Sequence, residues 1–434
     1  MTGILFPLNG DSRKDTNHVF CGCSLGKDVI KMNRKRKYRN FTLMLLAAAS
    51  VATGIYAYFD VKNSIPDEIH YCDEKERPLD RITDYPLVTY AEDMEVSGSG
   101  CYTVACKFAG VVPLKNVKVE KTDRPSVYVS GTSVGIYMET DGVLIVDSGE
   151  IQTTDGQLVK PAEHIVKAGD YIEKIDGEEL HSKKELVDRV AGSDGSAMVL
   201  SVIRQGESID LKVTPVKAED GSYKLGIWVR DNVQGIGTLT YVTQDGAFGA
   251  LGHGISDIDT GELLKLGDGE LYQAEILDVV KGASGSPGEL RGVIHYQNRN
   301  ILGDIDKNTK IGIYGTMSQE VVNQLSLVSY EVGMKQEIEE GPATILCSVD
   351  GATKEYQIEI RNIKLNQTDT NKCFEIHVTD EVLLQTTGGI VQGMSGSPII
   401  QNGKLVGAVT HVFVQDAASG YGIFAETMLE EAGR

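Results

Sequence analysis

A six-residue pattern of glycine, serine and proline occurs twice in this chain and constrains its fold more than any other feature. Residues 279–287 read Val-Val-Lys-Gly-Ala-Ser-Gly-Ser-Pro, and residues 390–398 read Ile-Val-Gln-Gly-Met-Ser-Gly-Ser-Pro. Each copy is followed by a strand-like run that ends in a histidine, and the two serines, Ser284 and Ser395, lie 111 residues apart. A repeat of this size among short strands predicts a pair of related β-barrels within residues 225–434.

Composition supports a fold rich in strands. Glycine accounts for 48 of the 434 residues, which favours tight turns over long helices, and 41% of the residues are apolar. A chain of this length can fill two or three hydrophobic cores. Within residues 225–434 we expect only two helices, at 318–325 and after Glu426.

The amino-terminal part predicts a membrane anchor. A basic cluster at residues 31–39 precedes Phe41–Phe59, nineteen residues without a charge. A helix of that length just spans a bilayer core of about 30 Å. The flanking positive charge keeps residues 1–40 cytoplasmic and sends residues 60–434 across the membrane. Small residues near Ala49 leave a cleavable signal peptide as an alternative.

Residues 60–124 are interpreted as a linker with some ordered structure, including a strand near residues 108–112. Seven cysteines occur in the chain, and five of them follow the apolar segment, where disulfides are chemically permitted. Five is an odd number, and we assign no bond.

Residues 125–216 alternate short strands with a helix that begins after Ser182, and they contain Gly-Asp-Tyr-Ile-Glu-Lys-Ile-Asp-Gly at 169–177. This region resembles a PDZ domain. The resemblance implies that the loop Ser133, Val134, Gly135 and Ile136 receives a peptide carboxylate while an extended peptide adds beside the following strand. An ordinary module whose glycines only make turns is the alternative.

Ser395 is the candidate nucleophile. A serine hydroxyl needs a positioned base, and the oxyanion that forms needs preorganised donors. The glycines around Ser395 free the amides of Gly393 and Ser395 to serve as those donors. Ser284 lies in the same pattern, but Glu289 follows closely and its carboxylate would oppose an oxyanion. We therefore interpret Ser284 as part of a structural turn.

His253 is the candidate base, because histidine alone has a suitable pKa without large perturbation. It lies between two glycines after a strand, in Leu-Gly-His-Gly-Ile, whereas His295, His377 and His411 lie within strand-like runs. On composition alone, the acid that orients the imidazole is one of four residues: Asp257, Asp259, Asp304 or Asp380.

The order of these segments resembles the stage IV sporulation protein B peptidase family over residues 30–434. The resemblance is carried by the basic leader, the apolar segment, the PDZ-like region, Ala250–Asp257 and the Gly-Met-Ser-Gly-Ser-Pro-Ile-Ile loop. It implies a mainly β chain with a trypsin-like double β-barrel peptidase domain. It also implies a triad of His253, Asp380 and Ser395, although Asp380 lies much nearer to the serine than the acid of trypsin-like enzymes does.

The resemblance further implies an extracytoplasmic endopeptidase of endospore formation, located between the forespore and mother-cell membranes. Such an enzyme cleaves itself and a membrane-bound regulator of an intramembrane protease that matures a mother-cell sigma factor, the sigma-K checkpoint. The alternative is a catalytically inert PDZ scaffold with a protease-like fold.

Several classes of function are not expected. The net charge of −20 opposes nucleic-acid binding by the large acidic part of the chain. No paired histidine or cysteine spacing typical of a zinc site follows the apolar segment, and no phosphate-binding loop is present. We therefore expect no metal and no cofactor.

Overall fold

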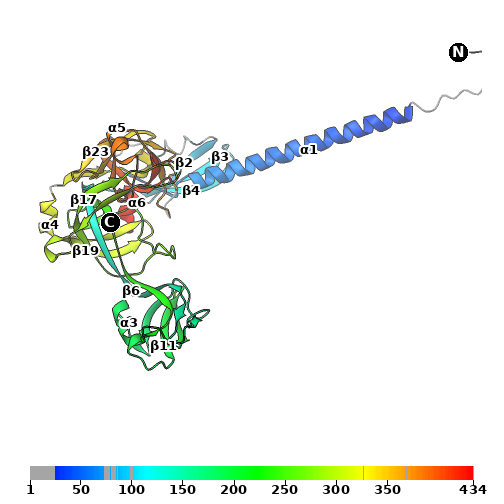
Figure 1. Cartoon of the computed structure of the whole chain (residues 1–434). Coiled ribbons are helices and arrows are strands. Elements are labelled where there is room, and N and C mark those ends of the chain that lie inside the picture. Colours follow the sequence, from blue (N-terminus) through cyan, green and yellow to red (C-terminus); the bar gives the residue numbers. More distant parts are fainter. Residues whose placement is uncertain are drawn as a thin grey trace, which may run out of the picture. The chain divides into compact units, whose positions relative to one another are not determined.

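A computed structural model describes residues 25–72, 79, 85, 87–97, 101–325, 327–366 and 370–433. The chain divides into two compact units, Met1–Lys62 and Asn63–Arg434. The first contains most of helix α1 (Leu25–Ser64), drawn in blue in Figure 1. This is the one described helix that is long and apolar enough to cross a membrane, and it includes the predicted span Phe41–Phe59. Residues 1–24 of the predicted leader lie outside the described residues.

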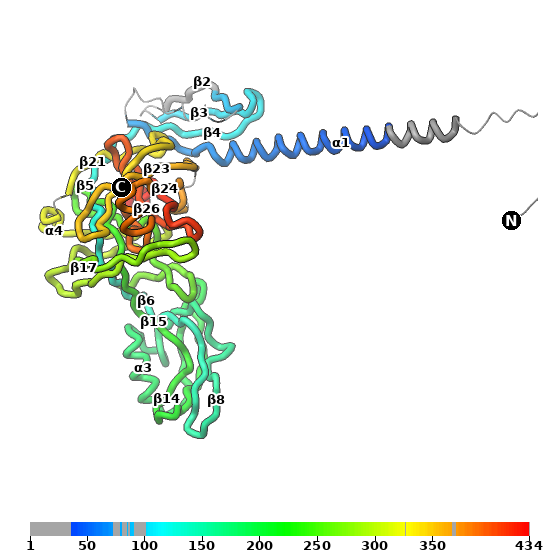
Figure 2. The backbone as a smooth tube through the Cα atoms, turned by 45° about the horizontal axis from the view of Figure 1, so that its top comes forward, coloured from blue at the N-terminus to red at the C-terminus, as the bar shows by residue number. Residues whose placement is uncertain are grey.

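The region predicted as a linker with some ordered structure contains a four-stranded sheet within its described residues, so it is more ordered than the sequence indicated. The sheet has the order β1-β4-β3-β2, with β1 parallel to β4 and the other pairs antiparallel. Figure 2 shows β3 and β4 of this sheet side by side. The strands are β1 (Glu68–Tyr71), β2 (Val88–Ser97), β3 (Cys101–Phe108) and β4 (Val112–Lys121). Val117 and Val119 of β4 are fully buried, while the charged residues between and beside them face outward. This alternation marks a half-buried strand.

The first barrel is a closed ring of strands. Its order is β6-β15-β16-β20-β19-β17, and β17 pairs back to β6. The strands are β6 (Ser133–Ser148), β15 (Ile227–Val242), β16 (Ala247–Ala250), β17 (Leu266–Val280), β19 (Ile301–Thr309) and β20 (Gly312–Thr316). Apolar side chains that include Met138, Leu239, Phe248 and Ile313 fill its interior.

The PDZ-like unit is inserted into the first barrel between β6 and β15. The carboxyl half of β6 and the amino half of β15 continue into this unit, whose core extends from Val143 to Val229. Its further elements are β7 (Ile151–Gln152), β8 (Leu158–Val159), β9 (Tyr171–Ile175), β10 (Glu178–Glu179), α3 (Lys183–Ala191), β11 (Met198–Arg204), β12 (Glu207–Val213), β13 (Val216–Lys217) and β14 (Tyr223–Lys224). The predicted boundaries at residues 125 and 216 therefore move, because residues 133–140 pair within the barrel.

The second barrel closes in the order β22-β23-β24-β27-β26-β25, and β25 pairs back to β22. The strands are β22 (Gly341–Cys347), β23 (Lys354–Arg361), β24 (Phe374–Val378), β25 (Pro398–Gln401), β26 (Lys404–Val412) and β27 (Ser419–Phe424). Phe374, Ile399 and Phe424 lie at the centre of its core. The repeat thus predicted two barrels correctly, but the first barrel also contains β6, which lies before the predicted start at residue 225.

The remaining elements join the barrels or cover their ends. They are β5 (Ser126–Val129), β18 (Glu289–Ile294), β21 (Val328–Val332), the short 3-10 helices η1 (Asn298–Asn300) and η2 (Lys335–Glu337), and helices α4 (Gln319–Gln324), α5 (Glu381–Thr387) and α6 (Ala425–Glu431). The helices α4 and α6 confirm the two that were predicted. The prediction of only two missed α5, which is short and begins at Asp380.

Candidate active site

Ser395 lies in a tight loop between α5 and β25. Gly393 and Gly396 have φ angles of 98° and 94°, a region that favours glycine. A Cβ atom on Gly396 would lie 2.1 Å from the carbonyl oxygen of Thr238, so the first barrel approaches too closely for a side chain. The Oγ of Ser395 donates a hydrogen bond of 2.9 Å to the carbonyl oxygen of Thr410. The loop thereby presents a partly exposed hydroxyl on a fixed backbone.

Two buried threonines of β15 hold this loop from the other barrel. The Oγ1 of Thr238 donates to the carbonyl oxygen of Gly393 at 2.8 Å, and its amide donates to the carbonyl oxygen of Ser395 at 3.0 Å. The Oγ1 of Thr240 donates to the carbonyl oxygen of Gly396 at 2.7 Å. Sequence reasoning missed both residues, because nothing in a strand pattern shows which neighbour a buried threonine binds.

The two amides predicted as oxyanion donors, those of Gly393 and Ser395, have no hydrogen-bond acceptor among the described residues. The neighbouring amides are hydrogen-bonded: that of Met394 donates to the carbonyl oxygen of Val391, and that of Gly396 donates to the carbonyl oxygen of Val409. Two unpaired N–H groups beside a serine hydroxyl can stabilise an oxyanion.

His253 lines the same pocket as Ser395, a cavity of about 390 Å³ between the two barrels. The residues before it turn sharply, with φ angles of 68° at Leu251 and 66° at Gly252. Its Nδ1 lies 2.8 Å from the carbonyl oxygen of Gly254. A carbonyl only accepts, so we place the proton on Nδ1, which leaves Nε2 as a free base. Burial lowers the pKa of His253, against a smaller opposing effect of that hydrogen bond.

His411 is a site residue that sequence reasoning set aside. Its ring centroid lies 5.1 Å from that of His253, and it lines the same pocket. Burial and the neighbouring His253 lower the pKa of His411 to about 4, so both rings are neutral near neutral pH. Its position after the second copy of the repeat was visible in the sequence, but the strand pattern gave no reason to prefer it to His295.

The structure places Asp380 at the start of α5 and not beside His253. Its Oδ1 accepts from the amides of Val382 and Leu383 at 2.9 and 3.0 Å, and its Oδ2 accepts from Gln357 at 3.2 Å. Asp380 is absent from the residues that line the pocket. These contacts are those of a helix N-cap and do not support the predicted role in a triad.

Of the other candidate acids, two form ion pairs with an arginine and one is exposed. Buried Asp257 pairs with Arg230, which also binds Asp259 at 2.9 Å, and Asp304 is exposed on β19. Within the described ranges no carboxylate hydrogen-bonds to His253. The carbonyl of Gly254 thus occupies the orienting position that an aspartate holds in a triad.

The predicted carboxylate loop is not a loop. Ser133, Val134, Gly135 and Ile136 are buried in β6, with β15 paired along one edge and β17 along the other. A Cβ atom on Gly135 would lie 2.4 Å from Ile294. No strand edge is left there for a peptide, so the predicted binding residues are wrong. The PDZ-like unit instead has a groove of about 420 Å³ beside α3, lined by residues that include Gly149, Ile151, Val187 and Trp228.

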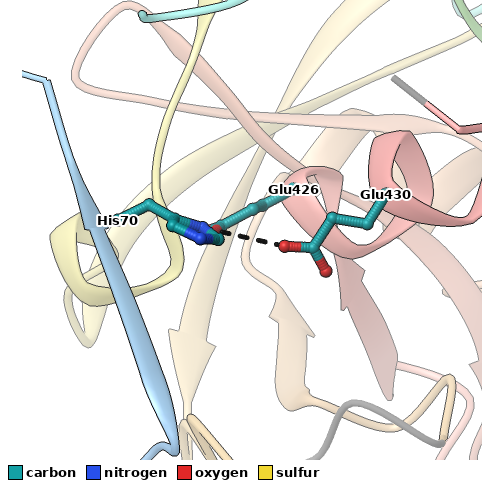
Figure 3. A group of neighbouring side chains, drawn as sticks. All are labelled: His70, Glu426 and Glu430. Carbon is teal, nitrogen blue, oxygen red and sulfur yellow. Dashed lines mark hydrogen bonds and ion pairs between the residues drawn. The ribbon is translucent and has the colours of Figure 1, made fainter. Parts of the chain in front are cut away.

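One group of side chains could hold a metal ion. His70 of β1 faces Glu426 and Glu430 of α6, and their ligand atoms lie within 4.8 Å of one another (Figure 3). His70 Nδ1 lies 2.8 Å from Glu426 Oε1 and 3.8 Å from Glu430. The hydrogen bond to Glu426 raises the pKa of His70, against the opposing effect of burial. An ion pair accounts for this geometry without a metal. Sequence spacing gave no sign of it, because 356 residues separate His70 from Glu426.

A serine hydroxyl, a free imidazole nitrogen and two unpaired amides in one pocket between two β-barrels are the groups that a serine peptidase uses. Residues 221–429 match the family described as SpoIVB peptidase S55. This match covers just under half of the chain and confirms the resemblance drawn from the sequence.

Other comparisons cover smaller parts of the chain. A Lactococcus lactis protein described as a zinc metalloprotease, LL2128, is 41% identical over 87 residues, which are 19% of this chain and 20% of that protein. The chain thus spans about a fifth of the length of this relative.

Two solved structures are similar to parts of the chain. The PDZ domain of an SdrC-like protein from Listeria monocytogenes is 22% identical and has a TM-score of 0.17, over 20% of this chain and 87% of that one. The inactive form of the Rv3671c protease is 13% identical and has a TM-score of 0.25, over 46% of this chain and 85% of that one.

Proposed function

We propose that the chain is a membrane-anchored endopeptidase in which Ser395 is the nucleophile and His253 is the general base. The observation that carries the proposal is that both side chains line one pocket beside the unused amides of Gly393 and Ser395. The Oγ of Ser395 leaves its hydrogen bond with Thr410 and turns to Nε2 of His253 when a substrate arrives.

The reaction follows from this geometry. Nε2 of His253 takes the proton as Oγ of Ser395 bonds to the peptide carbonyl carbon, and the two amides stabilise the oxyanion. The imidazolium then gives its proton to the leaving amine, which leaves an acyl-enzyme ester at Ser395. Water, deprotonated by His253, hydrolyses that ester and restores the hydroxyl.

The biological role we propose is cleavage during endospore formation, outside the cytoplasm and between the forespore and mother-cell membranes. The substrates would be the chain itself and a membrane-bound regulator of an intramembrane protease that matures a mother-cell sigma factor. The match of residues 221–429 to the SpoIVB peptidase family and the apolar helix α1 support this role.

Self-cleavage tests the proposal. The full chain in detergent micelles is incubated alone beside its Ser395→Ala variant, and Ser284→Ala serves as the matched control from the other copy of the repeat. We expect fragments from the wild type and from Ser284→Ala but none from Ser395→Ala. The same bands from all three chains would support the inert scaffold instead.

We also propose that the groove beside α3 binds the end of an extended peptide, in place of the residues first predicted. Trp228 lines this groove and is the only tryptophan in the chain. A hexapeptide with a free valine carboxylate should therefore change the tryptophan fluorescence of the full chain. Val187 is 55% exposed on α3, and Val187→Glu should abolish the change. An equal response to the amidated peptide would contradict carboxylate recognition.

A further inference from the structure

The first copy of the repeat, extended by the three residues up to Leu290, contacts the backbone that carries the oxyanion donors. It connects β17 to β18 and runs beside the segment that precedes Ser395. The amide of Gln392 donates to the carbonyl oxygen of Gly288 at 2.8 Å, and the amide of Leu290 donates to the carbonyl oxygen of Gln392 at 2.8 Å. The residue before Gly393 is therefore held on both its N–H and its C=O by Gly288, which follows the first copy, and by Leu290 of β18.

These bonds fix the direction of the Gly393 amide. The carbonyl of Gln392 and the N–H of Gly393 belong to one planar trans peptide, so they point in opposite directions. Because the carbonyl is held by Leu290, the N–H points away from β18. The next peptide is fixed as well, since Thr238 binds the carbonyl oxygen of Gly393. A Cβ atom on Gly393 would lie 3.0 Å from Leu290, so the two residues are already in close contact.

The first copy is also anchored on either side of the nucleophile segment. The amide of Gly282 donates to Thr387 at 2.8 Å, and the amide of Gly285 donates to Val414 at 2.7 Å. The Oγ of Ser284 donates to the carbonyl oxygen of Gln415 at 2.9 Å. Ser284 therefore contacts a backbone carbonyl and no base, although it is exposed.

We propose that residues 282–290 form a positioning element for the oxyanion hole, with Gly288 and Leu290 as its positioning residues and Ser284 as an outer anchor. This inference rests on the proposed function. The two copies of the repeat then have unlike roles: the second carries the nucleophile, and the first holds the Gly393 amide in place. Losing one oxyanion donor costs about 10²–10³-fold in kcat, so even a partial misalignment is measurable.

Gly288→Ala in the full chain, in detergent, tests the inference. A Cβ atom there would lie 2.2 Å from the carbonyl oxygen of Val280, so the turn must shift. Gly206→Ala, in the turn between β11 and β12, is the control, because no atom lies within 4 Å of its added Cβ. Hydrolysis of dye-quenched casein gives kcat and KM, and the thermal midpoint reports folding. We expect Gly288→Ala to lower kcat by about 10- to 100-fold with KM and the midpoint close to wild type.

Ser284 supplies a milder test that leaves the core untouched. Ser284→Ala removes one surface hydrogen bond and should lower kcat by about two- to tenfold, and Ser284→Thr should restore it. An active wild type with unchanged kcat in both Gly288→Ala and Ser284→Ala would overturn the positioning role alone. A fall in kcat that comes only with an equal loss of folded protein would also overturn it. A wild type that does not hydrolyse casein would overturn the proposed function itself.

Discussion

The hydroxyl of Thr238, in the first barrel, donates a hydrogen bond of 2.8 Å to the carbonyl oxygen of Gly393, in the nucleophile loop of the second. Thr238 is 1% exposed, so the carbonyl has no water to replace this donor. The bond couples the packing of one barrel to the direction of the oxyanion donors in the other.

Replacing Thr238 with valine should therefore impair catalysis and folding together. Valine keeps the shape but leaves the Gly393 carbonyl buried without its side-chain donor, which costs about 1–3 kcal/mol of unfolding free energy. We expect a fall in kcat on casein and a lower thermal midpoint. Thr238→Ser keeps the hydroxyl and should retain most of the activity; equal losses in both variants would show that the methyl group matters instead.

The pH dependence of catalysis should reflect the burial of His253. Burial lowers the pKa of this imidazole from its ordinary value of 6.5, so the neutral base persists into mildly acidic solution. The acid limb of a kcat/KM profile on casein should therefore have its midpoint below pH 6.5. A midpoint above 6.5 would show that a negative group faces His253 in the free enzyme.

Asp380 offers a clear choice between two roles. As a helix N-cap it is replaced well by asparagine, whereas alanine costs about 0.5–2 kcal/mol. If Asp380 is the acid of a triad, asparagine cannot replace it, because that substitution costs about 10⁴-fold in kcat. The observed contacts predict near-normal kcat for Asp380→Asn and a lower thermal midpoint for Asp380→Ala. A collapse of kcat in Asp380→Asn with an unchanged midpoint would restore the triad.

The ion pair between His70 of β1 and Glu426 of α6 should weaken as the pH rises. The pKa of His70 is raised above 6.5 by its hydrogen bond to Glu426, so its stabilisation is complete below that value. It is lost as the pH rises through the raised pKa, because the imidazole gives up its proton. The pKa of Glu426 is lowered despite its burial, so this carboxylate stays ionised throughout that range.

His70→Ala should therefore lower the thermal midpoint more at about pH 6 than at about pH 9. Exposed His181→Ala is the control and should change neither value. Equal shifts for His70→Ala at both pH values would mean that the ring contributes packing and not charge.

The two barrels and the tight loop at Ser395 could be predicted from sequence because local patterns encode them. Glycine spacing around Ser395 specifies a turn, and alternating apolar residues specify half-buried strands. The turn at His253 was visible for the same reason. These features depend on a few neighbouring residues, and the structure has them where the sequence indicated.

What the sequence did not reveal depends on which distant segments meet. Residues 133–136 read as a glycine-containing loop, yet pairing with β15 and β17 makes them an internal strand. Asp380 reads equally well as an acid or a cap, and only the fold shows that its oxygens bind α5. The hydroxyl of Thr238 and the contacts of Gly288 are likewise set by tertiary structure, which residue spacing does not report.

Labelling with a fluorophosphonate tests the central claim most directly. The probe bonds only to an activated serine, and mass mapping of the labelled full chain identifies which one. We predict a single adduct on Ser395 that survives in Ser284→Ala and disappears in Ser395→Ala and His253→Ala. An adduct on Ser284, or labelling of Ser395 that does not depend on His253, would contradict the account.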